Sequence, residues 1–334
     1  MGSEKVESPV AAPGCVRWTW SGMAHGMPLI AREIGRAAFE ALREPALWHV
    51  IACHSHSAYI RSDRGAVVCV GGPSIGRGAM NVPCDGGDSG IWSGLVTVGE
   101  TVVSSGDGWL LIGGRVSVDF GKAGVWEPAT FRPVSRGILI GRLAALTALV
   151  STDAPDGGYG PLIPRLIGAS EEGGPCRGST SGALMAEALF RGARDFRDWL
   201  RGRLEGDSRS EPGDAVRDLI GLGVGLTPSG DDFLGGALLA LRALRHDVVA
   251  DRLSDWLLPL LPARTGAVSA AHLACAAAGR GGEAVHAALE ALSAMDGGGA
   301  EAAIGILAGY GHSSGWDILA GMVIVLHEFA MIRE

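Results

Sequence analysis

Hydrophobic and polar positions divide this chain into two parts of different character. Between about residue 48 and residue 134, short runs rich in β-branched residues alternate with clusters of glycine. This pattern is typical of short strands joined by tight turns. Because the runs follow one another so closely, we expect antiparallel hairpins rather than β-α-β units. The clearest strands are predicted at residues 66–70, 95–98, 101–103, 109–112 and 115–119.

Apolar residues recur at helical spacing on both sides of this β-rich part. The segment LIAREIGRAAFEALR at residues 29–43 predicts one helix before the sheet. After Arg136, segments rich in alanine and leucine predict a mostly helical region. Its helices are expected at residues 138–150, 181–205, 231–245, 250–261, 269–278, 282–294, 301–307 and 317–332.

This segregation of strands from helices places the chain in the α+β class, with a β-rich N-terminal region followed by a mostly helical C-terminal region. We expect a flexible tail at residues 1–15, a β-rich domain at 16–136 and a helical domain at 137–334. The segment 151–179 is rich in Gly, Pro, Ser and Asp and is long for a loop, so it is a candidate lid or mobile segment.

Composition narrows the possible functions. Of the 334 residues, 47% are hydrophobic and 19% charged, which allows a sizeable core. The net charge of −8 argues against a nucleic-acid binder, because contacts to phosphates need a basic surface. The apolar runs are too short or too interrupted to span a bilayer, and the N-terminus has no apolar signal segment. We therefore expect a cytoplasmic protein that binds neither nucleic acid nor membrane.

Ligand-binding chemistry has to come from a small set of residue types. Lysine is nearly absent, so a charged contact to an anion would come from arginine. The six cysteines are scattered and form neither a disulfide framework nor a zinc-finger spacing, and we expect no metal and no cofactor. The segment Cys53-His-Ser-His56 predicts two histidines on one strand face, either as metal ligands or as a hydrogen-bonded surface pair. A glycine-rich loop that ends at Arg77 and Gly78 is either an anion cradle or a plain hairpin loop.

The most specific local feature is a helix start that occurs twice. A glycine-rich approach leads into TPSGDDFLGG, and a related segment, GHSSGWDILAG, lies near the C-terminus. Both contain the pattern S-G-x-D-x-L-x-G. The matched pairs are Ser229/Ser314, Gly230/Gly315, Asp232/Asp317, Leu234/Leu319 and Gly236/Gly321.

A purely structural interpretation of this repeat is available. Ser-x-x-Asp resembles a capping box, in which the serine and the acid satisfy free backbone N–H groups at the start of their own helix. Pro228 suits a first helical turn, where its missing N–H costs nothing.

Three observations favour a functional interpretation. Both helices are apolar nearly all round, so their starts are expected to be buried. Each contains a glycine one turn in, and close approach of the two helices would offset its cost of about 1 kcal/mol. Buried helix starts also offer N–H groups and a positive dipole end to an anion. We therefore predict Asp231, Asp232 and Asp317 as catalytic, and as substrate-binding residues Gly225, Thr227, Ser229, Gly230, His312, Ser313, Ser314 and Gly315.

The run G-x-G-L-T-P-S-G-D-D-F-L-x-G at residues 223–236 resembles the signature of a family of oxamate carbamoyltransferase subunits. The resemblance extends to residues 265–283 and 311–321, and more faintly to residues 56–59 and 72–73. It implies carbamoyl transfer from carbamoyl phosphate to the amide of oxamate, giving oxalurate, in purine-derived nitrogen catabolism. One helix start would hold the phosphate and the other the oxamate carboxylate. The chain lacks the Ser-x-Arg-Thr-Arg loop of the ordinary carbamoyltransferases.

The resemblance also bears on partners. It implies one subunit of a larger enzyme, so we expect a homo-oligomer or a hetero-oligomeric subunit with a small anionic substrate. Ile91, Trp92, Trp109 and Trp126 are candidates for an interface, or for the core of the β-rich domain. Two alternatives to a carbamoyltransferase remain open: a non-catalytic ligand-binding subunit, and a lyase or cyclase that uses the same anion pocket.

Overall fold

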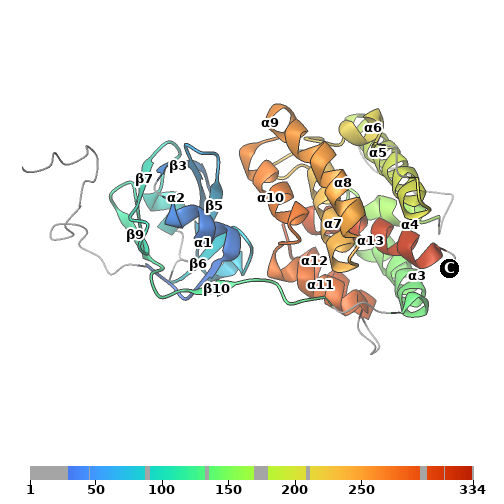
Figure 1. Ribbon diagram of the computed structural model, residues 1–334, viewed down its shortest axis with the longest axis horizontal. Coiled ribbons are helices and arrows are strands. Elements are labelled where there is room, and N and C mark those ends of the chain that lie inside the picture. The colour runs from blue at the N-terminus through green and yellow to red at the C-terminus, as the bar shows by residue number, and fades with distance from the viewer. Residues whose placement is uncertain are drawn as a thin grey trace, which may run out of the picture.

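The fold consists of a β-barrel followed by a helical region that lies beside it (Figure 1). This arrangement comes from a computed structural model, and it confirms the α+β class. The structure describes residues 29–44, 46–86, 91–131, 135–168, 180–207, 211–293, 299–311 and 313–332. The predicted tail at residues 1–15 lies outside these ranges.

Eight strands form the closed barrel in the order β1-β6-β5-β4-β3-β7-β8-β9. Most neighbours are antiparallel, as the close spacing of the strands predicted, whereas β5–β6 and the closing pair β1–β9 are parallel. The barrel strands are β1 Leu29–Ala31, β3 Leu47–Cys53, β4 Ser57–Ser62, β5 Val67–Gly71, β6 Asn81–Asp85, β7 Thr101–Ser104, β8 Trp109–Ile112 and β9 Val116–Asp119.

Smaller elements complete this region. The strands β2 (Glu33–Gly35) and β10 (Gly124–Trp126) pair in parallel beside the barrel. Helix α1 (Arg36–Arg43) and the short helices η1 (Pro73–Ile75) and α2 (Ile91–Leu95) lie between strands in the sequence.

Two predictions for this region were wrong. Residues 29–35 form β1 and β2, and the predicted helix begins only at Arg36. At Gly35 an added Cβ would lie 2.0 Å from the Gly78 carbonyl oxygen, so this backbone packs closely against a segment that is distant in sequence. The spacing of apolar residues in the sequence does not indicate such a contact. The predicted strand at 95–98 is absent, since α2 ends at Leu95 and no strand follows there. Trp92 of α2 is fully buried in the barrel core, which assigns it to packing rather than to an interface.

The helical region has its own hydrophobic core, separate from that of the barrel. Its predicted helices are confirmed, with boundaries shifted by a few residues and the segment 250–261 divided between α8, η3 and α9. The helices of this region are α3 Arg136–Asp153, η2 Gly160–Leu162, α4 Ile163–Leu166, α5 Thr180–Leu204, α6 Asp214–Arg217, α7 Ser229–Ala243, α8 Asp247–Leu257, η3 Leu258–Leu260, α9 Leu261–Arg264, α10 Ala267–Ala277, α11 Glu283–Ser293, α12 Gly299–Ala308 and α13 Ser314–Met331. The short helices η2, α4 and α6 were not predicted.

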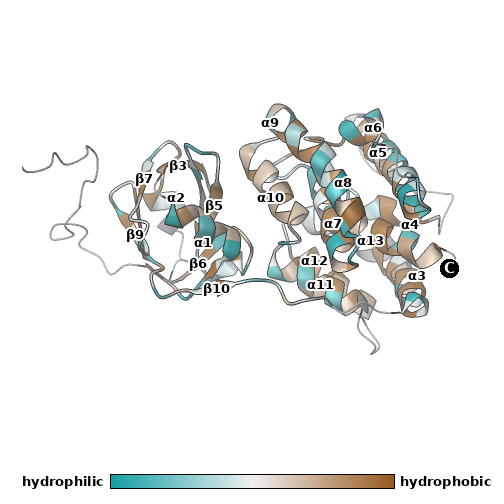
Figure 2. Ribbon diagram, in the orientation of Figure 1, coloured by the Kyte–Doolittle hydropathy of each residue, from teal (hydrophilic) through white to brown (hydrophobic). Residues whose placement is uncertain are grey.

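Helices α7 and α13 form the centre of this region. In Figure 2, α5 carries both brown and teal residues, as expected of a helix with one buried and one exposed face. By contrast, α13 is buried along most of its length. Among the described residues α13 is the one helix long and apolar enough to cross a membrane, but 72% of it is buried inside the protein, as in a core helix.

The predicted lid at residues 151–179 is in part a core segment. Tyr159 is fully buried and stacks on Phe233 of α7, with ring centroids 4.7 Å apart. Its hydroxyl donates to the Leu189 carbonyl oxygen at 3.1 Å. Residues 154–168 therefore pack into the helical region, while residues 169–179 lie outside the described part of the chain.

The barrel and the helical region meet through backbone as well as side chains. Gly78 forms a β-bridge with Gly282, and the Glu283 N–H donates to the Arg77 carbonyl oxygen at 2.9 Å. Arg77 also bridges the two regions as an ion pair, 2.6 Å from Glu33 and 3.0 Å from Glu283. These contacts fix the barrel against the segment between α10 and α11, and a cavity lies next to this junction.

Candidate functional site

Helices α7 and α13 approach each other closely because each has a glycine at the contact. A Cβ added at Gly236 would lie 2.1 Å from the Ile318 carbonyl oxygen, and one at Gly321 would lie 2.0 Å from that of Phe233. No side chain fits at either position. The predicted crossing of the two helices at these paired glycines is confirmed.

The shared serine and aspartate positions do not cap their own helices. The N-cap of α7 is Pro228, and neither α7 nor α13 has a side-chain cap hydrogen bond. Instead Ser229 lies beside the Asp317 carboxyl of the other helix. In the reciprocal arrangement, Ser314 lies beside Asp232. The capping-box interpretation is therefore wrong, because neither serine caps its own helix and each lies beside the acid of the other helix.

Asp317 is held deep behind the helix crossing. It is 1% exposed, and its Oδ1 accepts the Tyr159 N–H at 2.6 Å. Burial raises the pKa of this carboxyl, while hydrogen bonds from Tyr159, Ser229 and Ser313 oppose that rise. Asp317 thus fastens the segment around Tyr159 to the start of α13.

Asp232 lies in front of Asp317, on the wall of the cavity. Burial raises its pKa well above the ordinary value, and the nearby Asp317 and Asp231 raise it further. Hydrogen bonds from Ser314 and Thr227 act in the opposite direction. Its Oδ2 is buried and has no hydrogen-bond partner among the described residues. The raised pKa and the unpartnered Oδ2 favour the protonated form of this carboxyl group, which can donate a hydrogen bond.

Asp231 has the opposite character, since both of its carboxylate oxygens are occupied. Oδ1 accepts the Gly221 N–H at 2.9 Å, and Oδ2 accepts the hydroxyls of Thr265 at 2.5 Å and Ser269 at 2.7 Å. Asp231 therefore connects the loop before α7 to the end of α9 and the start of α10. Its contacts favour a positioning role, and the catalytic role expected from the sequence stays a prediction.

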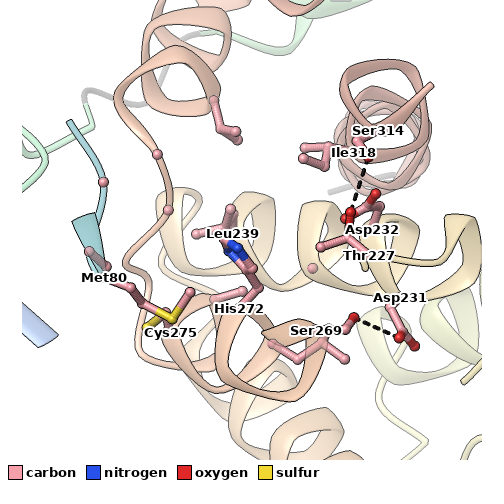
Figure 3. Close-up of a pocket in the computed structure, with 18 of the residues that line it drawn as sticks. Met80, Thr227, Asp231, Asp232, Leu239, Ser269, His272, Cys275, Ser314 and Ile318 are labelled. Atoms are coloured by element: carbon pink, nitrogen blue, oxygen red, sulfur yellow. Dashed lines mark hydrogen bonds between the residues drawn. The ribbon is translucent and has the colours of Figure 1, made fainter. Parts of the chain in front are cut away.

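A cavity of about 250 Å³ lies between the barrel and the helix crossing. The barrel contributes Tyr59 of β4, and the segment before α13 contributes Tyr310. Figure 3 shows Thr227, Ser314 and Asp232 gathered on one wall, with His272 of α10 on another. The hydroxyls of Thr227 and Ser314 are 3.1 Å apart, so they belong to one hydrogen-bonded group.

The histidine and the two tyrosines of the cavity are neutral at about pH 7. Burial lowers the pKa of His272 to about 4. Burial, together with the neighbouring Asp232, raises the pKa of Tyr310 to about 12, and burial also raises the pKa of Tyr59. Arg280 is the one arginine or lysine among the described residues that line the cavity, and it lies 3.4 Å from Glu40 and 3.9 Å from Glu127. The cavity thus offers hydroxyl and carboxyl groups rather than free positive charge.

Several of the predicted site residues do not reach the cavity. Thr227, Asp231, Asp232 and Ser314 line it. Gly230 and Gly315 are packing positions, where an added Cβ would lie 2.0 Å from the Leu219 oxygen and 1.9 Å from the Leu307 oxygen, respectively. Ser229, Ser313 and Asp317 lie behind the cavity wall. Gly225 lies in an exposed turn, and His312 is outside the described residues.

The helix starts are also poorer anion sites than the sequence suggested. The N–H of Gly230 donates to the Leu222 oxygen at 2.9 Å, and the N–H of Asp231 donates to the Pro228 oxygen at 2.9 Å. In α13 the Gly315 N–H donates to the Tyr310 oxygen at 2.9 Å. Because these amides are already paired, a ligand here would be bound mainly by side-chain hydroxyl and carboxyl groups.

The remaining candidates lose their predicted chemistry. His54 and His56 are exposed in the turn between β3 and β4, not on a strand face. Among the described residues no group of three or more potential metal ligands occurs. Arg77 is already paired with Glu33 and Glu283.

The sequence-based predictions missed Tyr59, Tyr310 and His272 as cavity residues. For Tyr59 there was one signal, the faint resemblance at residues 56–59. The other two reach the cavity only because α10 and the end of α12 pack beside the helix crossing.

The fold and the cavity define a two-part α+β protein with a small cavity between its parts. Residues 219–326 match the model of the family described as oxamate carbamoyltransferase subunit AllH. The match includes both helix starts and α10, so the family resemblance is confirmed for the segment that carries most of the cavity. No curated protein and no solved structure matches the chain.

Proposed function

We propose that this chain is a subunit of a carbamoyltransferase that acts on a small carboxylate or amide such as oxamate, with carbamoyl phosphate as donor. The observation that carries the proposal is Asp232, a buried carboxyl group on the wall of a small cavity, with one oxygen that has no partner among the described residues. The family match over residues 219–326 supports the class of reaction.

The reaction transfers a carbamoyl group between two small molecules. The amide nitrogen of oxamate attacks the carbonyl carbon of carbamoyl phosphate, and a C–N bond forms. The C–O bond to phosphate breaks, and the phosphate leaves with the bonding electron pair. The nitrogen loses one proton, which the departing phosphate takes up, so oxalurate and hydrogen phosphate are the products.

The size of the cavity suits such substrates. At about 250 Å³ it is smaller than the range of roughly 300–1,000 Å³ typical of pockets for drug-sized ligands. Thr227, Ser314 and a protonated Asp232 supply hydrogen-bond donors on one wall. These groups can orient a carboxylate or an amide, which is the positioning that a bimolecular transfer requires.

A second candidate is a ligand-binding subunit whose partner carries the chemistry. The neutral state of His272 and Tyr310 at about pH 7 favours it, because neither group has a pKa close to neutral, as an efficient general base would. The subunit description of the family points in the same direction. We therefore propose that catalysis requires a hetero-oligomeric assembly.

Turnover by the chain and by its assembly tests the proposal. The purified chain is incubated with carbamoyl phosphate and oxamate, alone and together with proteins that copurify with it from its own cells. Oxalurate and released phosphate are measured together. We expect turnover by the assembly that is lost with Asp232→Ala, whereas the exposed Asp107→Ala retains it. If the assembly binds oxamate but forms no oxalurate, the proposed reaction is wrong.

A further inference from the structure

The cavity contains hydrogen-bond donors without a matching positive charge. Five polar or titratable groups face or surround Asp232: Asp231, Asp317, Tyr59, Tyr310 and His272. The acids are hydrogen-bonded or protonated, and His272 is neutral at about pH 7. Arg280, at the cavity wall, is held by Glu40 and Glu127. A ligand with two negative charges would therefore meet no free cation among these residues.

Backbone amides do not replace the missing cations. Phosphate sites at helix starts use free N–H groups, which point at the anion together with the helix dipole. Here the N–H groups of Gly230, Asp231 and Gly315 are already bonded to carbonyl oxygens. The two helix starts also bring Asp232 and Asp317 close together, so they present acidic groups rather than cations to an anion.

A single carboxylate is a better match for this wall. A protonated carboxyl group that donates to a carboxylate forms a short, charge-assisted hydrogen bond. Asp232 is 8% exposed, lines the cavity, and has its Oδ2 free of partners among the described residues. The hydroxyls of Thr227 and Ser314 lie beside it and can donate to the same ligand or accept from its amide.

We propose that this cavity is the acceptor site of the transferase: it binds the small monocarboxylate that bears an amide, or its carbamoylated product, and excludes the phosphorylated donor. This assignment rests on the proposed function. Asp232 recognises the ligand carboxylate, and the Thr227–Ser314 pair holds the amide end. The donor phosphate is bound outside this cavity.

Calorimetric titration of the isolated, folded chain tests this assignment. The probes are oxamate, oxalurate, carbamoyl phosphate and inorganic phosphate. We expect oxamate or oxalurate to bind, and inorganic phosphate to bind at least about tenfold more weakly, a difference of about 1.4 kcal/mol. Phosphate binding as tight as that of oxamate, or no binding of either carboxylate by the folded chain, would overturn the acceptor-site proposal.

Variants of Asp232 and Ser314 test whether the cavity recognises oxamate through hydrogen-bond donors or only through its shape. Asp232→Asn keeps a donor and cannot ionise, so it should retain oxamate binding within a few-fold. Asp232→Ala and Ser314→Ala should each weaken it by about tenfold or more, a loss of at least 1.4 kcal/mol. Asp107→Asn and Thr101→Ala, on exposed barrel positions, serve as matched controls. Equal loss in the Asn and Ala variants of Asp232 would contradict the donor role.

The assay of the assembly distinguishes a failure of the acceptor-site proposal from a failure of the proposed reaction. If oxamate binds to the isolated chain as expected but the assembly forms no oxalurate, the acceptor-type cavity stands and the reaction is wrong. If the assembly forms oxalurate but the isolated chain prefers phosphate, the reaction stands and the acceptor assignment is overturned.

Discussion

Ser229 at the start of α7 lies beside the carboxyl group of Asp317 at the start of α13. Ser314 and Asp232 form the reciprocal pair. The repeated sequence motif therefore describes one contact made twice, with each helix supplying a hydroxyl and an acid. Only one of the two acids, Asp232, lines the cavity. Of the two similar segments, therefore, one contributes its acid to the cavity wall and the other contributes its acid to the packing behind it.

The glycine crossing gives the first prediction. In Gly236→Ala and Gly321→Ala the new Cβ would lie 2.1 Å or less from a backbone carbonyl oxygen of the other helix. Overpacking of this kind costs about 1–3 kcal/mol, so we expect lower unfolding free energies in urea. Gly235→Ala in the same helix is the control, because its Cβ meets only Leu273 at 3.7 Å and Ala276 at 4.0 Å. Similar stability of the Gly235→Ala and Gly236→Ala proteins would contradict the close approach.

Asp231 gives the second prediction. Asp231→Ala removes the acceptor of the Gly221 N–H and of the Thr265 and Ser269 hydroxyls. A buried donor left without a partner costs about 1–3 kcal/mol, so we expect a clear loss of unfolding free energy. Thr265→Ala and Ser269→Ala should each reproduce part of that loss. An Asp231→Ala protein that is as stable as the wild type but has lost ligand binding would instead support the catalytic role expected from the sequence.

The buried acid on the cavity wall makes stability depend on pH. Because the pKa of Asp232 is raised above its ordinary value of 3.8, the folded protein retains a proton that the unfolded chain releases. The stabilisation from this group is complete below pH 3.8 and is lost as pH rises toward the folded-state pKa. We therefore expect Asp232→Asn to be more stable than the wild type at neutral pH, with the difference shrinking as the pH falls.

Urea denaturation of both proteins at a series of pH values checks this third prediction. Asp107→Asn, at an exposed position in the barrel, is the control and should show no such trend. A difference between Asp232→Asn and the wild type that stays constant with pH would mean that Asp232 is not protonated in the folded state.

The sequence predicted the helix crossing well because its information is local. Ser229, Asp232 and Gly236 stand at helical spacing, and the same spacing recurs at the second start. The residues that complete the cavity come from elsewhere in the chain. Tyr59 lies in a barrel strand that was not predicted individually, and its position depends on how the barrel docks against the segment between α10 and α11.

The roles of individual residues were harder to predict than their location. Asp231 and Asp232 are neighbours in sequence, yet both carboxylate oxygens of Asp231 accept hydrogen bonds, whereas Asp232 has an oxygen without a partner in the described part of the chain. That difference is set by Thr265 and Ser269, more than thirty residues away in the chain.

Distant partners also explain the wrong prediction near the start of the barrel. The β1 and β2 strands replaced the predicted start of a helix because their partners lie in β6, β9 and β10.

The three tyrosines of the chain provide the last prediction. Tyr59 from the barrel and Tyr310 from the helical region both line the cavity near Asp232, whereas Tyr159 lies in the core, where its hydroxyl donates to Leu189. Removing a hydroxyl that contacts a ligand costs about 0.5–1.5 kcal/mol. Tyr59→Phe and Tyr310→Phe should therefore weaken oxamate binding by about two- to tenfold, by calorimetry, and leave stability nearly unchanged. Tyr159→Phe makes the same chemical change and should do the reverse, lowering stability and leaving affinity alone. Since Tyr59 comes from the barrel, a Tyr59→Phe protein that binds oxamate like the wild type would show that the helical region forms the ligand site without it.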